Sequence, residues 1–311
     1  MELTALIDRA AALGCRVTPG APMAGATTFR IGGPAQVLID LPDAAAAKAV
    51  LIACRQAGIP WFVLGNGSDL LVGDRGIPGA VLRLSRSAQP QLLPEGRILC
   101  GAGVSLQRLC LFAREHALTG LEFAYGIPGT VGGALYMNAG AYGGEMADVV
   151  LEADCLLPGG QPEDVQSVTL DRAALALGYR HSALMTLAAD RGVLATAVRL
   201  QLQPGDSAAI AARMKELLAR RQEKQPLEYP SAGSFFKRPA GHYAGALIEE
   251  AGMKGYRVGD AQVSEKHAGF VVNRGHATAA EVRALCRDVQ AAVRARAGVE
   301  LEPEVRFIGD F

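Results

Sequence analysis

The sequence predicts a fold that mixes helices with strands. Apolar residues recur at helical spacing in several segments, and short apolar runs typical of buried strands lie between those segments. Half of the residues are apolar and a fifth are charged, so the chain can bury a substantial core and need not be disordered. Its 311 residues suggest a division into roughly two or three domains.

Helices are predicted where an apolar stripe follows a capping residue. The clearest begins with Thr278 and Glu281, which form a capping box, and Gly298 stops it. Three others are predicted over residues 42–58, from Ser105 through His116, and from Asp206 or Ser207 to the charged run before Pro226.

Strands are predicted at the short apolar runs, which cover residues 61–65, 70–72, 97–104, 149–157, 193–202 and 301–309. Residues 226–239 are predicted to form a loop with one short strand, and the best domain break lies at 222–230. Residues 124–144 contain too many glycines, together with a proline, to form an ordinary helix throughout.

Charge and targeting signals indicate a cytoplasmic protein. Lys plus Arg and Asp plus Glu both total 31, which gives no support to a nucleic-acid or membrane-surface partner. The N-terminus lacks the basic-then-apolar pattern of a signal peptide. No run reaches the ~18 apolar residues of a membrane helix.

The cysteines and histidines show no metal-site pattern. The six cysteines are scattered without a CxxC pair, and the five histidines have no HExxH or similar spacing. We expect buried free thiols in place of disulfides, and no metal ligands.

The first motif that bears on chemistry is VLGNGSDLLV, residues 63–72. Successive backbone N–H groups in a polar turn between glycines can hold an anion, and glycine permits close approach of a ligand. The spacing is not GxGxxG, since Leu70 stands where a third glycine would be, and no amphipathic helix follows. An anion cradle and an ordinary glycine turn both fit this motif.

A second and longer motif, YGIPGTVGGALYMNAGAYGGE, covers residues 125–145. Its glycines would let the chain wrap an extended ligand such as a dinucleotide. Apolar residues such as Ile127 and Val131 argue against a solvated linker, so ligand binding is the preferred interpretation.

Three shorter motifs carry single reactive side chains. YRHS places Arg180 beside a tyrosine, which most often indicates a surface salt bridge. SAGSFFKRP surrounds Ser234 with small residues, and because no GxSxG elbow is present it favours a proton-donating or structural serine over a hydrolase nucleophile. LEPEVRFIG would place Glu302 and Glu304 on one face of an extended segment, a pattern that also suits an edge-strand ion pair.

Together the segments resemble the UDP-N-acetylenolpyruvoylglucosamine reductase family. Seven motifs occur in the family order over nearly the whole chain: TTFRIGGPA, LGNGSDLLV, GIPGTVGGALYMNAGAYGGE, YRHS, KQPLEYPSAGSFFKRP, AGALIEEAGMKGYRVGDAQVS and LEPEVRFIG. Each is weak alone, but the ordered set is specific. The short connection between Tyr179 and the SAGSFFKRP loop resembles the shorter form of the family.

The resemblance implies an α+β fold. Its flavin-binding region would be vanillyl-alcohol-oxidase-like, with two subdomains, and a separate α+β domain would bind the substrate. We assign residues 1–84 to the first FAD-binding subdomain, joined by a C-terminal strand within 299–311. Residues 85–223 are assigned to the second subdomain and residues 224–298 to the substrate domain.

The resemblance also implies the activity. Members of the family reduce the enolpyruvyl C=C of UDP-N-acetylglucosamine enolpyruvate to UDP-N-acetylmuramate for peptidoglycan, with FAD as cofactor and NADPH as hydride donor. We therefore expect a small-molecule substrate and a monomer. Arg180 would bind the substrate carboxylate, and Ser234 would deliver a proton to the α-carbon. Glu304 would help as a protonated hydrogen-bond donor, and its protonation state is left open by the sequence.

Binding residues follow from the same motifs. FAD is expected to contact Gly65, Asn66, Gly67, Ser68, Asp69, Leu70, Gly126, Ile127, Pro128, Gly129, Thr130, Val131, Gly132 and Gly133. The substrate is expected to contact Tyr142, Lys224, Lys237 and Arg238.

Two positions depart from the family pattern. Asp69 stands where many relatives have Asn, and its carboxylate would repel a diphosphate unless it turned away. Arg238 stands where the longer form of the family has Asn, and an arginine can hold a diphosphate through two parallel hydrogen bonds.

Two other functions compete with this interpretation. An FAD-linked oxidase or dehydrogenase of the same flavin-binding superfamily would act on an alcohol, but it would not need the SAGSFFKRP and LEPEVR motifs. A non-enzymatic nucleotide-binding protein would explain the glycine loops, but it would leave Arg180, Ser234 and Glu304 without a role.

Overall fold

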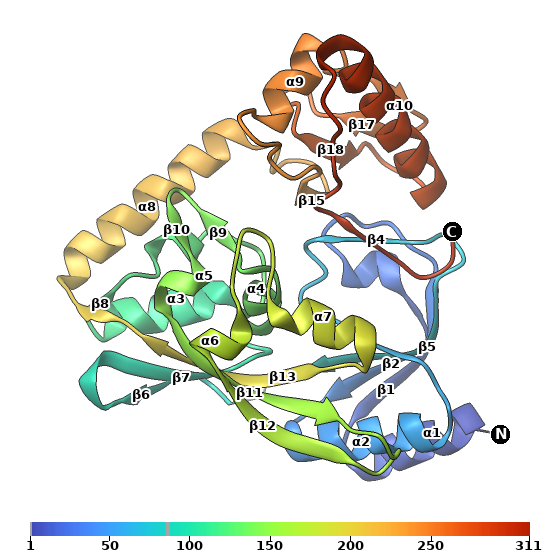
Figure 1. The fold of residues 1–311 in the computed structure, drawn as a ribbon, viewed down its shortest axis with the longest axis vertical. Coiled ribbons are helices and arrows are strands. Elements are labelled where there is room, and N and C mark those ends of the chain that lie inside the picture. The colour runs from blue at the N-terminus through green and yellow to red at the C-terminus, as the bar shows by residue number, and fades with distance from the viewer. Residues whose placement is uncertain (1, 85–87) are drawn as a thin grey trace. The chain divides into compact units, whose positions relative to one another are not determined.

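The computed structural model describes residues 2–84 and 88–311, which divide into two units built from segments far apart in the sequence (Figure 1). Unit 1 contains Met1–Pro19, Val37–Asn66 and Gly79–Ala219. Unit 2 contains Gly20–Gln36, Gly67–Pro78 and Arg220–Phe311. The predicted division into three domains stays a prediction, and residues 1 and 85–87, which fall within it, lie outside the described residues.

The first sheet has the strand order β1-β2-β5-β3 and consists of β1 (Arg16–Pro22), β2 (Pro34–Leu41), β5 (Ile77–Leu84) and β3 (Trp61–Val63). Helices α1 (Glu2–Ala12) and α2 (Ala44–Gln56) pack with it around a core that includes Leu6, Val37, Val50 and Leu82. The predicted helix over 42–58 is confirmed as α2. Strand β3 is only half-buried, where a buried strand is predicted, because it lies at the edge of this sheet.

The second sheet of unit 1 has the order β12-β11-β13-β7-β6, and all its neighbours run antiparallel. Its strands are β6 (Gln91–Leu93), β7 (Arg97–Gly101), β11 (Val150–Pro158), β12 (Val165–Asp171) and β13 (Leu194–Gln201). The predicted strands over 97–104, 149–157 and 193–202 are thus confirmed, with shifts in their ends.

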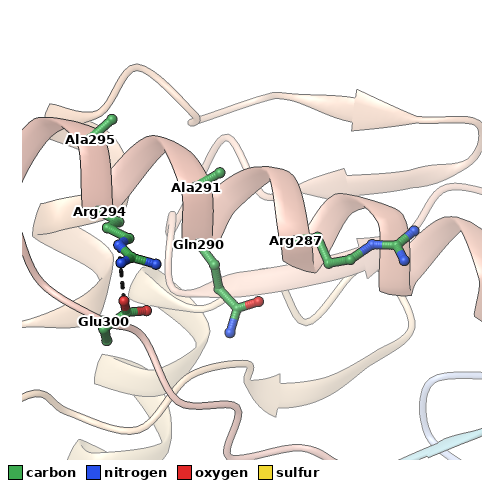
Figure 2. A pocket seen from close by; sticks show the side chains of 6 residues that line it. All are labelled: Arg287, Gln290, Ala291, Arg294, Ala295 and Glu300. Atoms are coloured by element: carbon green, nitrogen blue, oxygen red, sulfur yellow. Dashed lines mark ion pairs between the residues drawn. The ribbon is translucent and has the colours of Figure 1, made fainter.

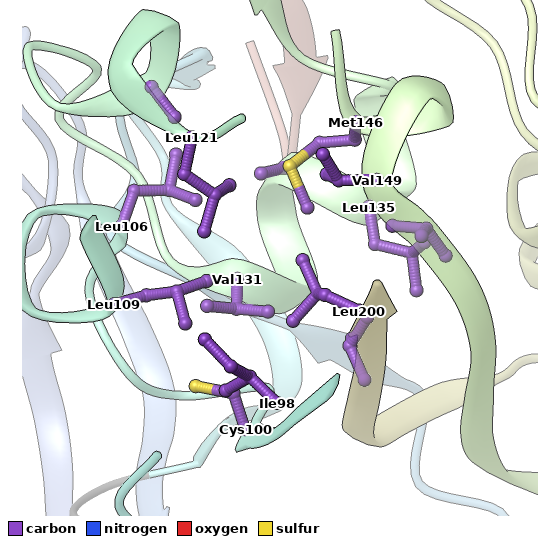
Figure 3. Packing of buried hydrophobic residues seen from close by; sticks show 14 of the residues in the cluster. Ile98, Cys100, Leu106, Leu109, Leu121, Val131, Leu135, Met146, Val149 and Leu200 are labelled. Carbon is purple, nitrogen blue, oxygen red and sulfur yellow. The ribbon is translucent and has the colours of Figure 1, made fainter. Parts of the chain in front are cut away.

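Helix α3 (Leu106–Glu115) and the short helix α4 (Val131–Met137) share a core with this sheet. The hydroxyl of Ser105 caps α3 by accepting a hydrogen bond from the N–H of Arg108 at 3.2 Å, as its position in the sequence predicts. Figure 3 shows the core, where Leu106, Leu109, Val131, Leu135 and Leu200 converge.

Short elements complete unit 1. They are η2 (Pro94–Gly96), η3 (Glu122–Ala124), α5 (Met146–Val149), α6 (Arg172–Leu175), α7 (Ala183–Asp190), the pair β8 (Leu118–Thr119) and β14 (Gln203–Pro204), and the hairpin of β9 (Gly140–Ala141) and β10 (Gly144–Glu145). Helix α8 (Ser207–Lys224) begins in unit 1 and ends in unit 2, and Asp206 caps it through the N–H of Ala209 at 2.8 Å.

Unit 2 is built on an antiparallel sheet in the order β15-β18-β17-β16, formed by Ser231–Ser234, Phe270–Asn273, Ala261–Val263 and Arg257–Val258. Helices α9 (Ala244–Glu250) and α10 (Ala279–Ala297) pack with it. The predicted capping box of Thr278 and Glu281 is present, and Gly298 ends α10 with a left-handed φ of 67°. The apolar stripe of α10 is fully buried.

The C-terminal segment returns to an early part of unit 2. Strand β19 (Arg306–Ile308) pairs in parallel with β4 (Leu70–Val72), and η1 (Met23–Ala26) precedes the TTFRIGG loop of the same unit. Only three residues of the predicted strand over 301–309 are extended in this pairing. Its leading residues instead form backbone hydrogen bonds with the SAGSFFKRP loop.

All six cysteines are buried free thiols, as predicted. Burial raises the pKa of Cys54, Cys100 and Cys155 to about 12, which keeps these thiols protonated and inert. Within residues 2–84 and 88–311, no helix is long and apolar enough to cross a membrane, and no group of His, Cys, Asp and Glu is arranged to hold a metal ion.

Candidate functional site

Parts of the two glycine motifs meet directly within unit 1. The side-chain amide of Asn66 donates a hydrogen bond to the carbonyl oxygen of Pro128 at 2.7 Å. A Cβ atom on Gly65 would lie 2.7 Å from the hydroxyl oxygen of Thr130, so the two motifs are in close contact at this glycine. The structure therefore brings together residues that are separated in the sequence and that we predict to bind the same cofactor.

The second motif folds into a turn followed by a short helix. Thr130 begins α4 and accepts a hydrogen bond from the N–H of Gly133 at 3.2 Å. Gly132 packs against Ala102, where a Cβ would lie 2.9 Å from the alanine side chain. Val131 is buried, whereas Pro128 and Gly133 are exposed. The glycines thus serve both close packing and an accessible backbone, which fits a segment that holds a ligand.

The remaining part of the first motif, Gly67–Leu70, belongs to unit 2. Gly67 has a left-handed φ of 60°, and a Cβ there would lie 2.3 Å from the carbonyl oxygen of Ala26. The N–H of Thr28 donates to the carbonyl of Gly67 at 3.1 Å. The first glycine motif is therefore fitted against the TTFRIGG loop, a contact that sequence reasoning did not anticipate.

Asp69 departs from the family pattern, and its carboxylate is turned partly into the protein. Its Oδ2 atom is buried, and its backbone carbonyl accepts a hydrogen bond from the N–H of Arg306 at 3.0 Å. Ser68 is half-buried and Leu70 is buried beside it.

Arg180 lies at the tip of a tight turn in unit 1. Gly178 and His181 exchange backbone hydrogen bonds at 3.0 and 3.1 Å across this turn, and Arg180 itself adopts a left-handed φ of 51°. Its guanidinium stands 5.1 Å from the ring centroid of Tyr179 and donates to the carbonyl oxygen of Gly140 at 3.4 Å. Arg180 is half-buried on this turn.

Tyr142 lies on the hairpin that Arg180 contacts. It occupies the turn between β9 and β10 with a left-handed φ of 55°, followed by Gly143 with a φ of 88°. Its side chain is 36% exposed, so it is accessible to a ligand. The structure thus brings two predicted site residues, Arg180 and Tyr142, onto neighbouring turns of unit 1.

Two buried polar residues that sequence reasoning missed support the Arg180 turn. The amide of Asn138 donates to the carbonyl oxygen of Gly178 at 2.9 Å, and the hydroxyl of Ser182 donates to the carbonyl oxygen of Tyr136 at 2.6 Å. Both side chains are completely buried. Asn138 lies within the motif of residues 125–145, and Ser182 ends the YRHS motif. Their place in these motifs was the available signal, since buried polar side chains require specific hydrogen-bond partners.

Ser234 and Glu304 are held on adjacent stretches of backbone in unit 2. Ser234 ends β15 with its side chain exposed, while the following Phe235 and Phe236 are 1% and 3% exposed and anchor the loop as predicted. Phe236 forms an antiparallel bridge with Pro303, and the N–H of Glu304 donates to the carbonyl of Phe235 at 2.9 Å.

The two carboxylates of the C-terminal motif have different surroundings. Glu302 is exposed and forms an ion pair with Lys237, whose backbone N–H also donates to the carbonyl of Glu302 at 2.8 Å. Glu304 is half-buried, next to the buried Val305. The ion-pair interpretation of this motif therefore holds for Glu302.

The remaining predicted substrate residues of unit 2 are cationic and accessible. The guanidinium of Arg238 lies 4.7 Å from the ring centroid of the exposed Tyr243. Lys224 is exposed at the end of α8. Arg180 and Tyr142 belong to unit 1, whereas Ser234, Lys237 and Arg238 belong with Glu304 to unit 2.

A groove of about 670 Å³ lies along α10, and Figure 2 shows its lining. Arg294 forms an ion pair with Glu300 at 3.1 Å at one end, and Arg287 lies further along the helix. The lining residues are Arg287, Gln290, Ala291, Arg294, Ala295 and Glu300, none of which is a predicted site residue.

Comparison with known proteins points to one family. Residues 225–308 match the model of the C-terminal domain of UDP-N-acetylenolpyruvoylglucosamine reductase, and residues 35–166 match the model of an FAD binding domain. The UDP-N-acetylenolpyruvoylglucosamine reductase of Agathobacter rectalis is 47% identical over 302 residues, which cover 93% of each chain. That of Heliobacterium modesticaldum is 47% identical over 290 residues, covering 93% of this chain and 90% of the relative.

A solved structure agrees with the sequence comparison. The crystal structure of UDP-N-acetylenolpyruvylglucosamine reductase from Thermus caldophilus is 36% identical and superposes with a TM-score of 0.77, covering 94% of this chain and 98% of that chain. Together with the match to an FAD binding domain, this confirms the predicted α+β fold class with a flavin-binding region.

Proposed function

The chain belongs to the UDP-N-acetylenolpyruvoylglucosamine reductase family, and from this premise we propose the roles of its individual residues. It is an FAD-dependent oxidoreductase that consumes NADPH and reduces the enolpyruvyl C=C of UDP-N-acetylglucosamine enolpyruvate, a step of peptidoglycan synthesis. The alternative of an oxidase acting on an alcohol has no comparable support.

The glycine motifs fit a bound dinucleotide. Residues Gly65 and Asn66 contact the Pro128–Thr130 turn, and a Cβ at Gly65 would lie 2.7 Å from the hydroxyl oxygen of Thr130. We assign the FAD pyrophosphate to the backbone N–H groups of both motifs, because uncharged N–H groups can approach phosphate closely. When bound, FAD takes hydride from NADPH and supplies it to the β-carbon of the substrate.

Arg180 is assigned to the carboxylate of the enolpyruvyl group. Addition of hydride to the β-carbon drives negative charge into this carboxylate and produces an enolate-like dianion. A guanidinium can hold both carboxylate oxygens and stabilises the added charge as it develops. The half-buried position of Arg180, on a turn held at both ends, supports this role because an immobile cation requires little reorganisation during the reaction.

Ser234 is assigned as the proton donor to the α-carbon. One hydride at the β-carbon and one proton at the α-carbon complete the reduction of the double bond. The hydroxyl is exposed while its loop is anchored by Phe235 and Phe236, so it is both accessible and fixed. Serine is a weak acid, and the strong basicity of the dianion provides the driving force for this transfer.

Glu304 is assigned as a neutral hydrogen-bond donor to the developing dianion. Only a protonated carboxyl group would stabilise negative charge, since a carboxylate would repel it. Its half-buried position beside Val305 supports this assignment. The nearby Glu302 is compensated by Lys237 and is not given a catalytic role.

Tyr142, Lys224, Lys237 and Arg238 are assigned to substrate binding. The three cations of this set are suited to a UDP diphosphate, and Arg238 can bind it through two parallel hydrogen bonds. We further propose a cytoplasmic monomer that uses no nucleic-acid partner. A balanced net charge and a nucleotide-linked substrate support this assignment.

The contact between Asn66 and Pro128 is the structural observation that carries the cofactor assignment. The purified protein should contain FAD, and anaerobic NADPH should bleach its absorbance. Addition of UDP-N-acetylglucosamine enolpyruvate should then restore the oxidised spectrum and yield UDP-N-acetylmuramate. Reduction by an alcohol, with reoxidation by oxygen and no response to the enolpyruvyl substrate, would instead support an oxidase.

A further inference from the structure

We propose that Asn138 is a positioning residue for Arg180. The inference rests on the proposed role of Arg180 in binding the substrate carboxylate. Asn138 is completely buried, so it cannot touch the substrate and can act only through its neighbours. Its amide contacts Gly178, which opens the turn that carries Arg180.

The Arg180 turn needs such support. Arg180 has a left-handed φ of 51°, a conformation that is strained for a residue other than glycine. Arginine also loses considerable side-chain entropy when it is held in one geometry. A turn of this kind keeps its conformation only where the surrounding structure constrains it, and here the constraint comes from buried hydrogen bonds on both flanks.

An asparagine fits this position chemically. Its Oδ1 accepts a hydrogen bond from the N–H of Ala147 at 2.8 Å, while its Nδ2 donates to the carbonyl oxygen of Gly178 at 2.9 Å. The two partners thus require one acceptor and one donor on the same short side chain, which an amide supplies and a carboxylate does not. The backbone φ of 42° is left-handed, where asparagine is among the best tolerated residues after glycine.

Ser182 supplies the anchor on the other flank. Its hydroxyl donates to the carbonyl oxygen of Tyr136, within the last turn of α4, and Asn138 caps the end of the same helix. Arg180 is therefore fastened before and after the turn to one helix. Because Thr130, within the proposed FAD motif, caps the start of α4, the helix next to the proposed flavin loop also holds the turn of the proposed carboxylate-binding arginine.

Two substitutions separate positioning from general stability. Asn138→Asp keeps the acceptor for Ala147 and the tolerance for left-handed backbone, but it presents an oxygen to the carbonyl of Gly178. Asn138→Gly keeps the backbone conformation and removes both side-chain bonds. With FAD content checked, both variants should slow reoxidation of reduced FAD by the enolpyruvyl substrate about 10- to 100-fold, the effect expected for a displaced catalytic group. Reduction by NADPH should stay within about twofold of wild type, because Arg180 does not serve that step.

Thr196→Val provides a matched control in unit 1. It removes a half-buried side-chain hydrogen bond, from Oγ1 to the carbonyl oxygen of Asp154 at 3.1 Å, on strand β13 and outside the Arg180 turn. Both half-reactions should be unchanged in this variant. If the Asn138 variants do not fold, Ser182→Ala takes their place and should show the same selective slowing.

A double-mutant cycle with Arg180→Lys decides between the possible outcomes. If Asn138 acts through Arg180, adding Asn138→Asp to Arg180→Lys should slow reoxidation little further. Fully additive losses, or near-normal reoxidation in every Asn138 and Ser182 variant while Arg180→Lys is slow, would overturn the positioning role. Near-normal reoxidation in Arg180→Lys itself would instead show that the proposed role of Arg180 is wrong.

Discussion

The backbone N–H of Glu304 donates a hydrogen bond at 2.9 Å to the carbonyl oxygen of Phe235, the residue that follows Ser234. The bridge between Phe236 and Pro303 extends this pairing. The loop that carries the proposed proton donor is thereby held in place by the C-terminal segment that carries the proposed hydrogen-bond donor. Each residue can be tested separately because the pairing uses backbone atoms and not their side chains.

Ser234→Ala should abolish product formation and leave reduction of FAD by NADPH intact, because only the step at the α-carbon uses the hydroxyl. Stopped-flow traces of the two half-reactions measure this directly. Ser231→Ala, on the same strand β15, is the matched control and should behave like wild type. Equal damage to both half-reactions in Ser234→Ala would mean that Ser234 is structural.

Arg180→Lys should slow the half-reaction with the enolpyruvyl substrate by about 100-fold or more, with little change in FAD content. Lysine keeps the charge but loses the planar group that holds two carboxylate oxygens. Arg172→Lys, at the exposed start of α6, controls for loss of a guanidinium elsewhere in unit 1. Near-normal turnover of Arg180→Lys would argue against carboxylate binding.

Glu304→Gln should retain substantial turnover, while Glu304→Ala should lose most of it. Glutamine keeps a hydrogen-bond donor of similar shape, as a neutral carboxyl group requires. Turnover of both variants across pH, with FAD occupancy measured in each, tests the assignment. A Gln variant as inactive as the Ala variant, with flavin still bound, would indicate that Glu304 works in its charged form.

Gly67→Ala should lower FAD content and stability more than Gly58→Ala does. Both glycines have a left-handed φ, near 60° and 62°, so the backbone strain of an alanine should destabilise the fold by about 1 kcal/mol at either position. A Cβ at Gly67 would also lie 2.3 Å from the carbonyl oxygen of Ala26, whereas nothing lies within 4 Å at Gly58. Thermal melts with and without added FAD measure the difference, and equal effects of the two substitutions would contradict it.

Asp40→Asn should destabilise the protein at neutral pH and progressively less in acid. Burial alone would raise the pKa of Asp40, but hydrogen bonds from Arg83 and Arg16, at 2.6 and 2.7 Å, more than offset burial and hold the pKa below 3.8. Because the folded-state pKa of Asp40 lies below its unfolded-state pKa of about 3.9, the ionised carboxylate stabilises the fold at pH values above the unfolded-state pKa. This stabilisation is lost as the pH falls through the folded-state pKa.

At pH 7, Asp40→Asn should lower the free energy of unfolding by about 1–3 kcal/mol, the usual effect of removing one partner of a buried charged hydrogen bond. Urea melts of wild type and variant between pH 7 and pH 3 would measure it, with the exposed Asp8→Asn as control. If the difference in unfolding free energy between Asp40→Asn and wild type grew as the pH fell, the predicted direction of the pH dependence would be wrong.

Local signals in the sequence were sufficient for the four predicted helices and for the family. Ser105, Asp206 and the pair Thr278 and Glu281 marked helix starts that the structure has, because a cap depends on residues only a few positions apart. The glycine motifs and their order identified the family, which the comparisons confirm.

Contacts between distant residues were decided by the tertiary structure alone. The meeting of Asn66 with Pro128, the buried anchors Asn138 and Ser182 of the Arg180 turn, and the pairing of Lys237 with Glu302 all join segments that no local pattern relates. Each of these contacts is a hydrogen bond or ion pair between residues that come together only when whole sheets and helices pack. The sequence by itself therefore determined the family and the candidate residues for the chemistry, and the fold determined which neighbours contact them, because such contacts arise only when distant backbone is brought within hydrogen-bond distance.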